Sequence, residues 1–226
     1  KKIYEILDKK KRISIDDLGY LIGPILNSGG RLSKSNYATE LLSTNNEKNM
    51  TSIINKLIKL NEQRKKIEQK ILEEIDFNKI EKENKKIIII YKLNLNEGLI
   101  GIIAARLKEY FNKPAIVITN SSDFLKGSAR SIPSFDIGLA INNTHDQNLI
   151  INGGGHKMAA GFSLKKAKLK DFIKHMNKHY SKGNTDNRKN LFFYESKISS
   201  TAFNKNFYNE IDKLTPFGTG NNEPLF

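Results

Sequence analysis

The clearest pattern in the chain is a row of apolar residues between Glu47 and about Phe77. Its members are Met50, Ile53, Ile54, Leu57, Leu60, Ile67, Ile71 and Ile75. Their recurrence every three to four residues predicts one long amphipathic helix. The other positions are highly charged and the stripe slips at Arg64, so we expect a solvent-exposed connector between two domains rather than a coiled coil.

After this helix the pattern changes to short apolar runs that alternate with helical stretches. The expected strands are 87–91, 115–119, 126–131 and 161–164, and the expected helices are 99–111, 135–142 and 169–180. The first strand, the first helix and the second strand follow one another as a β-α-β unit. The sequence therefore predicts an α/β domain of about 100 residues.

Both ends of the chain have less regular patterns. Residues 1–44 are expected to be helical and rich in loops, with a break at Gly23-Pro24 that ends one element. Residues 181–187 have the composition of a linker. Beyond it we expect a strand at 191–198 and a helix at 203–214. The chain starts without methionine and ends before a fold can close, which indicates a piece of a longer polypeptide.

Composition excludes several classes of protein. The 226 residues include no cysteine, so disulfides, thiolate nucleophiles and thiolate-held zinc are excluded, and a reducing compartment is favoured. The longest apolar run, 87–91, is far shorter than the roughly 20 residues of a membrane span, and no export leader opens the sequence. We therefore expect a cytoplasmic protein that makes no membrane contact.

The formal charge of +14 favours a polyanionic partner, which is usually nucleic acid. Part of this charge reflects a composition dominated by Lys, Ile and Asn, so placement matters more than the total. Residues 83–183 carry 16 basic and 7 acidic residues, whereas 184–226 carry five of each. Arginine is the side chain suited to fork-like phosphate recognition. Arg31 and Arg130 lie in clusters with Gly and Ser, and Arg106 is expected to be an ordinary mid-helix residue.

The sharpest local motif is Gly153-Gly154-Gly155-His156. Consecutive glycines let successive backbone N–H groups converge on one anion, and His156 can add a polar or cationic contact. A plain tight turn is the alternative interpretation. The segment 127–131 favours anion binding, because Ser128, Arg130 and Ser131 would place two hydroxyls and a guanidinium along an extended strand.

Two further glycine motifs are less specific. Asn27 and Arg31, on either side of Ser28-Gly29-Gly30, are a second candidate oxygen-binding corner, and a glycine turn that caps the following helix is the alternative. The segment 98–101 (GLIG) lacks the third glycine of a dinucleotide fingerprint, so we assign it to helix–strand packing. No carboxylate–histidine cluster suited to two metals and no activated nucleophile is legible.

Taken together, these motifs resemble the RecJ family of single-strand-specific exonucleases, within the DHH phosphoesterase superfamily. The segments that carry the resemblance are 23–32 (GPILNSGGRL), 96–107 (NEGLIGIIAARL), 126–133 (KGSARSIP), 154–161 (GGHKMAAG) and 214–224 (LTPFGTGNNEP). The resemblance implies an α/β protein with four parts. These are the end of a DHH domain at 1–45, a connecting helix at 46–82, a DHH-associated substrate-binding domain at 83–182 and the beginning of an OB-fold domain at 186–226.

The implied activity is 5′-to-3′ hydrolysis of single-stranded DNA in DNA repair and recombination. The complete enzyme is expected to use Mn²⁺ or Mg²⁺, with the metal ligands upstream of Lys1, so this segment alone is expected to be inactive. Single-stranded DNA is the implied partner, and we expect a single-strand-binding protein or a helicase as a further partner. The protein is expected to be a monomer. Two alternatives stay open. One is a DHH phosphodiesterase that acts on short oligonucleotides or cyclic dinucleotides, and the other is a non-catalytic single-strand-binding module.

The resemblance also assigns residues. The implied nucleic-acid or phosphate-binding residues are Asn27, Arg31, Ser128, Arg130, Ser131, Gly153, Gly154, Gly155 and His156. No residue of the segment is assigned to catalysis or to a metal. Two positions depart from the family pattern: Asn96 replaces the usual histidine, and Asn222 replaces a proline in the last motif.

Overall fold

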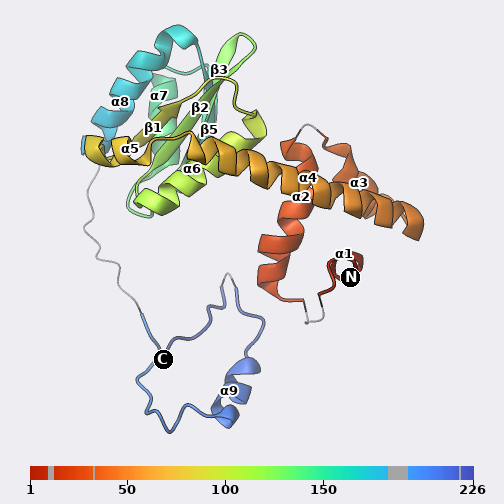
Figure 1. Cartoon of the computed structure of the whole chain (residues 1–226). Helices are drawn as coiled ribbons and strands as arrows, with labels where there is room; N and C mark the ends of the chain where they lie inside the picture. Colours follow the sequence, from red (N-terminus) through yellow and green to blue (C-terminus); the bar gives the residue numbers. More distant parts are fainter. Residues whose placement is uncertain (10–12, 33, 183–192, 219) are drawn as a thin grey trace. The chain divides into compact units, whose positions relative to one another are not determined.

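The computed structural model describes residues 1–9, 13–32, 34–182, 193–218 and 220–226 (Figure 1). The chain divides into two compact units. The larger unit is Asn27–Asp186, and the smaller one combines Lys1–Leu26 with Asn187–Phe226. Within the described residues, no helix is both long enough and apolar enough to cross a membrane.

The helical part of the larger unit is organised around α4 (Glu47–Glu73). The side chain of Asn46 caps this helix by accepting from two backbone N–H groups. Most of its apolar stripe is buried, although Ile67 is exposed, and the helix packs against α3 (Asn36–Ser43) and α6 (Glu97–Phe111). The predicted helix is confirmed, but the expectation of a solvent-exposed connector is wrong for this inner face. The helix ends at Glu73, and α5 (Phe77–Glu83) follows it.

The glycine-rich segment before α3 is helical. A short π-helix (Asp17–Ile22) runs directly into α2 (Gly23–Arg31), so the helical backbone continues through Pro24. The predicted break at Gly23-Pro24 and the alternative of a glycine turn at 28–30 are therefore both wrong. A Cβ at Gly29 would collide with the backbone oxygen of Lys34, so glycine here permits close packing rather than a turn.

Five strands form one sheet in the order β1-β2-β3-β5-β4. They are β1 (Ile88–Tyr91), β2 (Ala115–Ser121), β3 (Phe124–Arg130), β4 (Asn152–His156) and β5 (Ala159–Leu164). β1 and β2 are parallel and are joined through α6, which confirms the predicted β-α-β unit. The other pairs are antiparallel.

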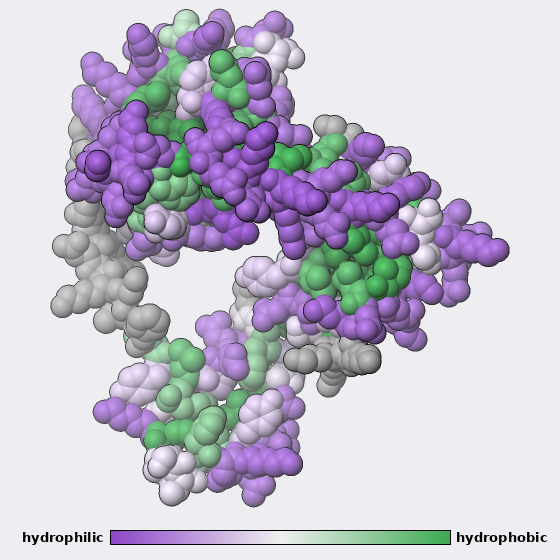
Figure 2. All heavy atoms as spheres, in the orientation of Figure 1, coloured by the Kyte–Doolittle hydropathy of each residue, from purple (hydrophilic) through white to green (hydrophobic). Residues whose placement is uncertain are grey.

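The sheet separates two apolar cores (Figure 1). On one face, α6 packs Leu99 and Ile103 against Ala115 and Val117 of β2. On the other face, α7 (Ile137–Asp146) and α8 (Leu169–Lys182) cover residues such as Phe162. Hydrophilic residues cover most of the visible outside of this domain, with apolar residues showing between them (Figure 2). α7 contacts β4 and β5, whereas the main sheet contacts of α6 are with β2 and β3.

The smaller unit has less regular structure. It contains α1 (Lys2–Ile6), the π-helix, the first residues of α2, and α9 (Lys205–Asp212). The helix predicted at 203–214 is confirmed as α9. Residues 193–198 form no strand, so that prediction is wrong over this range, and 191–192 lie outside the described residues. The predicted linker 181–187 is wrong for 181–182, which end α8, and its other residues lie outside the described residues. The beginning of an OB fold stays a prediction.

Candidate nucleic-acid interface

The sheet register collects polar residues on the face that α6 covers only in part. Lys126, Ser128 and Arg130 alternate along β3 and therefore share one face. The register continues this face across β5 and β4 in three rows: Lys126, Ser163, Asn152; then Ser128, Gly161, Gly154; then Arg130, Ala159, His156. α6 contacts β2 and β3, whereas Gly161 and His156 are exposed. We call these nine residues the open face.

The glycine run contributes to the open face through a single member. A Cβ at Gly154 would meet no atom within 4 Å, so the surface above it is open. A Cβ at Gly153 would meet the Phe162 side chain, and one at Gly155 would meet Ala160, both on the core side. The run is a strand and not the alternative tight turn. Because successive N–H groups of a strand point in opposite directions, the expected convergence of three N–H groups is also wrong.

A groove of about 510 Å³ lies between the start of α6 and the open face. Glu97, Ile100, Lys126, Ser128, Gly161 and Ser163 are among its lining residues. Lys126 Nζ pairs with Glu97 Oε2 at 2.5 Å. Hydrogen bonds from Lys126 and Ser121 hold the pKa of the Glu97 carboxyl below its ordinary value. The groove is thus lined by groups that can contact a polyanion, with one acidic group at its edge.

Arg130 is held by its own strand. Nη1 donates to the Ala129 carbonyl oxygen at 2.8 Å and to Ser128 Oγ at 3.2 Å. Gly101 of α6 provides the space for the guanidinium, because a Cβ there would lie 2.9 Å from Arg130 Nη2 and 3.0 Å from Ser128 Oγ. This confirms the assignment to helix–strand packing for Gly101, whereas Gly98 packs against the backbone of Arg31 in α2.

Arg31 reaches the same region from the end of α2. Its Nη1 donates to the carbonyl oxygen of Gly98 at 3.0 Å. Burial lowers the pKa of the Arg31 guanidinium, and the charge of Arg64 lowers it further. Burial also lowers the pKa of Arg130, and the charge of Arg31 lowers it further. The two guanidinium groups lie against adjacent turns of α6, at Gly98 and Gly101. Among the described residues, no ion pair joins either group to a carboxylate.

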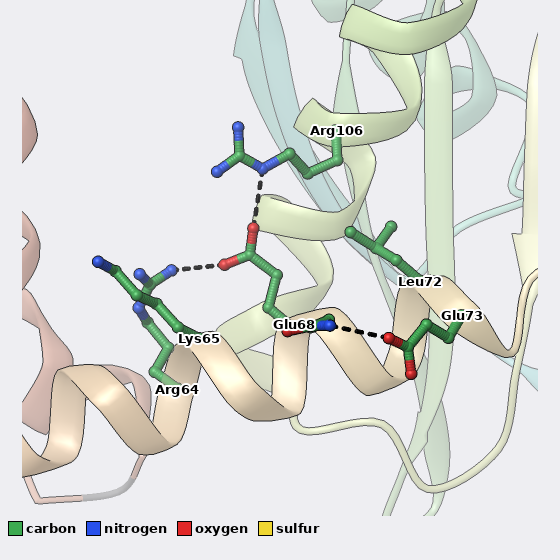
Figure 3. A pocket seen from close by; sticks show the side chains of 7 residues that line it. Arg64, Lys65, Glu68, Leu72, Glu73 and Arg106 are labelled. Carbon is green, nitrogen blue, oxygen red and sulfur yellow. Dashed lines mark hydrogen bonds and ion pairs between the residues drawn. The ribbon is translucent and has the colours of Figure 1, made fainter.

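A second set of arginines surrounds a buried carboxylate on α4. Arg64 Nη1 and Arg106 Nε donate to the two oxygens of Glu68 at 2.7 and 2.8 Å, and Arg64 Nε donates to Asn61 Oδ1 at 3.1 Å. The side chains of Arg64, Glu68 and Arg106 border a pocket of about 440 Å³ (Figure 3). Sequence reasoning missed this network, although the slip of the apolar stripe at Arg64 was its signal. Arg106 is a half-exposed mid-helix residue as expected, and its Nε also links α6 to Glu68 of α4.

The remaining candidates have separate places. Ser131 is 1% exposed and its hydroxyl donates to the Phe135 carbonyl oxygen at 2.7 Å, so it does not join the row of Ser128 and Arg130. Asn27 is exposed on α2, four residues before Arg31 and on the same side of the helix. His156 is exposed, and its Nδ1 accepts from the backbone N–H of Met158 at 3.3 Å.

The residues present do not fit a divalent metal. Across the described ranges, no group of three or more His, Asp or Glu side chains could hold an ion. Glu68, the buried carboxylate of the arginine network, is surrounded by guanidinium groups and has both oxygens engaged. The open face therefore offers binding chemistry, and we derive no metal-dependent step from these residues.

The chain is similar to known proteins in both sequence and fold. Residues 84–182 match the DHHA1 domain. The chain is 31% identical over 225 residues to the single-stranded-DNA-specific exonuclease RecJ of Haemophilus influenzae, covering 96% of this chain and 39% of that protein. It is 34% identical over 181 residues to the RecJ of Salmonella typhimurium, covering 76% of this chain and 31% of that protein. The crystal structure of RecJ in complex with Mg²⁺ from Thermus thermophilus has the same fold, with a TM-score of 0.84 and 24% identity over 100% of this chain and 35% of that one.

The matched domain and the fold define a DHHA1-containing protein of the DHH phosphoesterase superfamily. Within this superfamily, the chain belongs to the RecJ family. It spans between about a third and two fifths of the length of these relatives.

Proposed function

We propose that this chain is the part of a 5′-to-3′ single-stranded-DNA exonuclease that binds the nucleic-acid backbone. The observation that carries this proposal is the pair Arg31 and Arg130, two partly buried guanidinium groups beside the open face that form no ion pair with a carboxylate of the described chain. Placing two like charges together in partial burial is unfavourable without an anion. A phosphodiester supplies that anion.

The geometry of the open face supports a single strand as the ligand. Its rows repeat every second residue of a strand, which is roughly 7 Å, a spacing comparable to that of successive phosphates in an extended strand. Gly161 and Gly154 keep the middle row free of side chains, so a nucleic-acid backbone can approach the sheet closely. Ser128 and Lys126 add a hydroxyl and an ammonium donor along the same line.

Hydrolysis is proposed for the complete protein. The relatives named as exonucleases are more than twice as long as this chain. Solved structures of RecJ from Thermus thermophilus carry Mg²⁺ or Mn²⁺. We place the divalent metal and its ligands in a part of the protein outside these residues, and we expect the chain alone to bind without cleaving. Three further points stay predictions. These are a role in DNA repair and recombination, a single-strand-binding protein or helicase as partner, and the monomeric state.

The test is a titration of the chain with a fluorescent, 5′-phosphorylated oligothymidylate at several KCl concentrations. We expect binding that weakens steeply with salt. Arg130→Ala should weaken it by about 1–3 kcal/mol, as for the loss of a charge-assisted contact. Lys174→Ala is the matched control, since it removes the same charge from the exposed face of α8, on the other side of the sheet. Equal effects of the two variants would contradict the assigned role of Arg130.

A further inference from the structure

Glu68 lies on the inner face of α4 with only 6% of its surface exposed. A carboxylate is rarely buried to this degree unless partners compensate its charge. Arg64 of α4 donates to one oxygen and Arg106 of α6 donates to the other, as Figure 3 shows. One buried carboxylate therefore joins the two helices.

α6 lies against both guanidinium groups of the proposed binding site. The carbonyl oxygen of Gly98 accepts the hydrogen bond from Arg31. Gly101 leaves the space in which the guanidinium of Arg130 lies. A movement of α6 relative to α4 would displace Arg31 and Arg130 together, and the Glu68 bridge resists that movement.

Glu68 also compensates charge. Arg64 is 8% exposed, and among the described residues its side chain donates to Glu68 and to the neutral Oδ1 of Asn61. The charge of Arg64 lowers the pKa of Arg31, and the charge of Glu68 raises it. Without the carboxylate, a buried guanidinium beside Arg31 would keep its charge with only an amide to offset it, an arrangement that forces neighbouring groups to move.

We propose that Glu68 is a positioning residue for nucleic-acid binding: it fixes Arg64 and α6 so that Arg31 and Arg130 face the strand together. Glu68 itself touches no phosphate. This inference rests on the proposed function of the open face.

The decisive variant is Glu68→Gln, because two explanations predict opposite results. If Glu68 contributed only its negative charge, its removal would strengthen the binding of a polyanion. If it positions the arginines, binding to the 5′-phosphorylated oligothymidylate should weaken about tenfold, and the slope of log K against log salt should fall by about 0.7, the value for one lost phosphate contact on a single strand.

Two further variants keep the test independent of folding. Glu73→Gln removes the same charge from an exposed position of α4 whose partner is Gln69, and should leave affinity and slope unchanged. Arg106→Lys preserves charge at a half-exposed side chain but removes the Nε donor to Glu68. Positioning predicts weaker binding and a smaller slope for Arg106→Lys, whereas a pure charge effect predicts no change.

The outcomes separate this inference from the proposed function. If the wild-type chain binds and Glu68→Gln binds equally or more tightly, or if Arg106→Lys has no effect, the positioning role is overturned while the proposed function stands. If the wild-type chain does not bind the oligonucleotide at any salt concentration, the proposed function fails and the positioning role fails with it. Weaker binding and a smaller slope for both variants, with Glu73→Gln unchanged, support the role.

Discussion

Arg31 Nη1 donates to the carbonyl oxygen of Gly98 at 3.0 Å, across a sequence separation of 67 residues. The two backbones are also in contact, since a Cβ at Gly98 would collide with the backbone oxygen of Arg31 and lie 2.8 Å from its Cα. The end of α2 is therefore seated on the first turn of α6. This contact brings an arginine of the helical part to the edge of the sheet domain.

Gly98→Ala should lower the free energy of unfolding by about 1–3 kcal/mol, because the added methyl group meets backbone that cannot rotate away. Urea denaturation of the chain measures this change. Gly30→Ala is the control: the same substitution lies in α2, and its Cβ would meet no atom within 4 Å. Alanine in a helix is intrinsically more favourable than glycine, so Gly30→Ala should raise stability by up to about 1 kcal/mol. Equal stability changes in the two variants would contradict the proposed backbone contact.

Gly154 and Gly155 are adjacent, but they should respond to substitution in different assays. Gly155→Ala places a methyl group against Ala160 and the Ala159 carbonyl, so we expect lower stability by about 1–3 kcal/mol. Gly154→Ala places it in open space on the proposed binding face, so stability should hold while oligonucleotide affinity falls by about 1 kcal/mol. Urea denaturation and fluorescence anisotropy measure the two effects. A Gly154→Ala variant with full affinity would show that the strand does not approach this row.

Much of the sheet domain could be predicted because its signals are local. The apolar runs before and after α6 indicated the β-α-β unit, and the alternation of Ser128 and Arg130 correctly placed both on one face. Ser131 was misassigned because it directly follows Arg130: alternation would point it to the opposite face, and it also lies beyond the last residue of β3. Its hydroxyl is used by the following loop instead.

The features that could not be predicted depend on contacts between distant segments. β4 is built largely of glycine, which has no strand propensity, and it exists because β5 and α7 pack against it. A glycine turn was one alternative for Ser28-Gly29-Gly30, but these residues are helical, and Gly29 packs closely against Lys34 and Leu57. The Glu68 network could be predicted only with the knowledge that α4 and α6 lie side by side.

Asn96, where the family resemblance leads us to expect histidine, has a clear structural role. It is the N-cap of α6, and its Oδ1 accepts from the backbone N–H of Gly98 at 2.8 Å. Asn96→Ala should therefore lower the free energy of unfolding by about 1 kcal/mol. Asn96→Asp retains the capping oxygen and should match the wild type. Thermal or urea unfolding decides this, and an Asp variant as unstable as the Ala variant would rule out capping as the role of Asn96.

The Glu97–Lys126 pair gives the stability of the groove a pH dependence. Hydrogen bonds from Lys126 and Ser121 lower the pKa of Glu97 in the folded state, so the ionised carboxylate favours folding. This contribution is fully present above the ordinary pKa of a glutamate, and it is lost as the pH falls through the lower, folded-state pKa.

Glu97→Gln tests this dependence directly. The wild type should be more stable than the variant near neutral pH, by less than about 1 kcal/mol because both side chains are partly exposed. The difference should shrink as the pH is lowered below the ordinary pKa of glutamate. High KCl should reduce it at neutral pH, since salt screens exposed pairs. Urea denaturation of both proteins across this pH range provides the measurement, and a difference that grows on acidification would contradict the lowered pKa of Glu97.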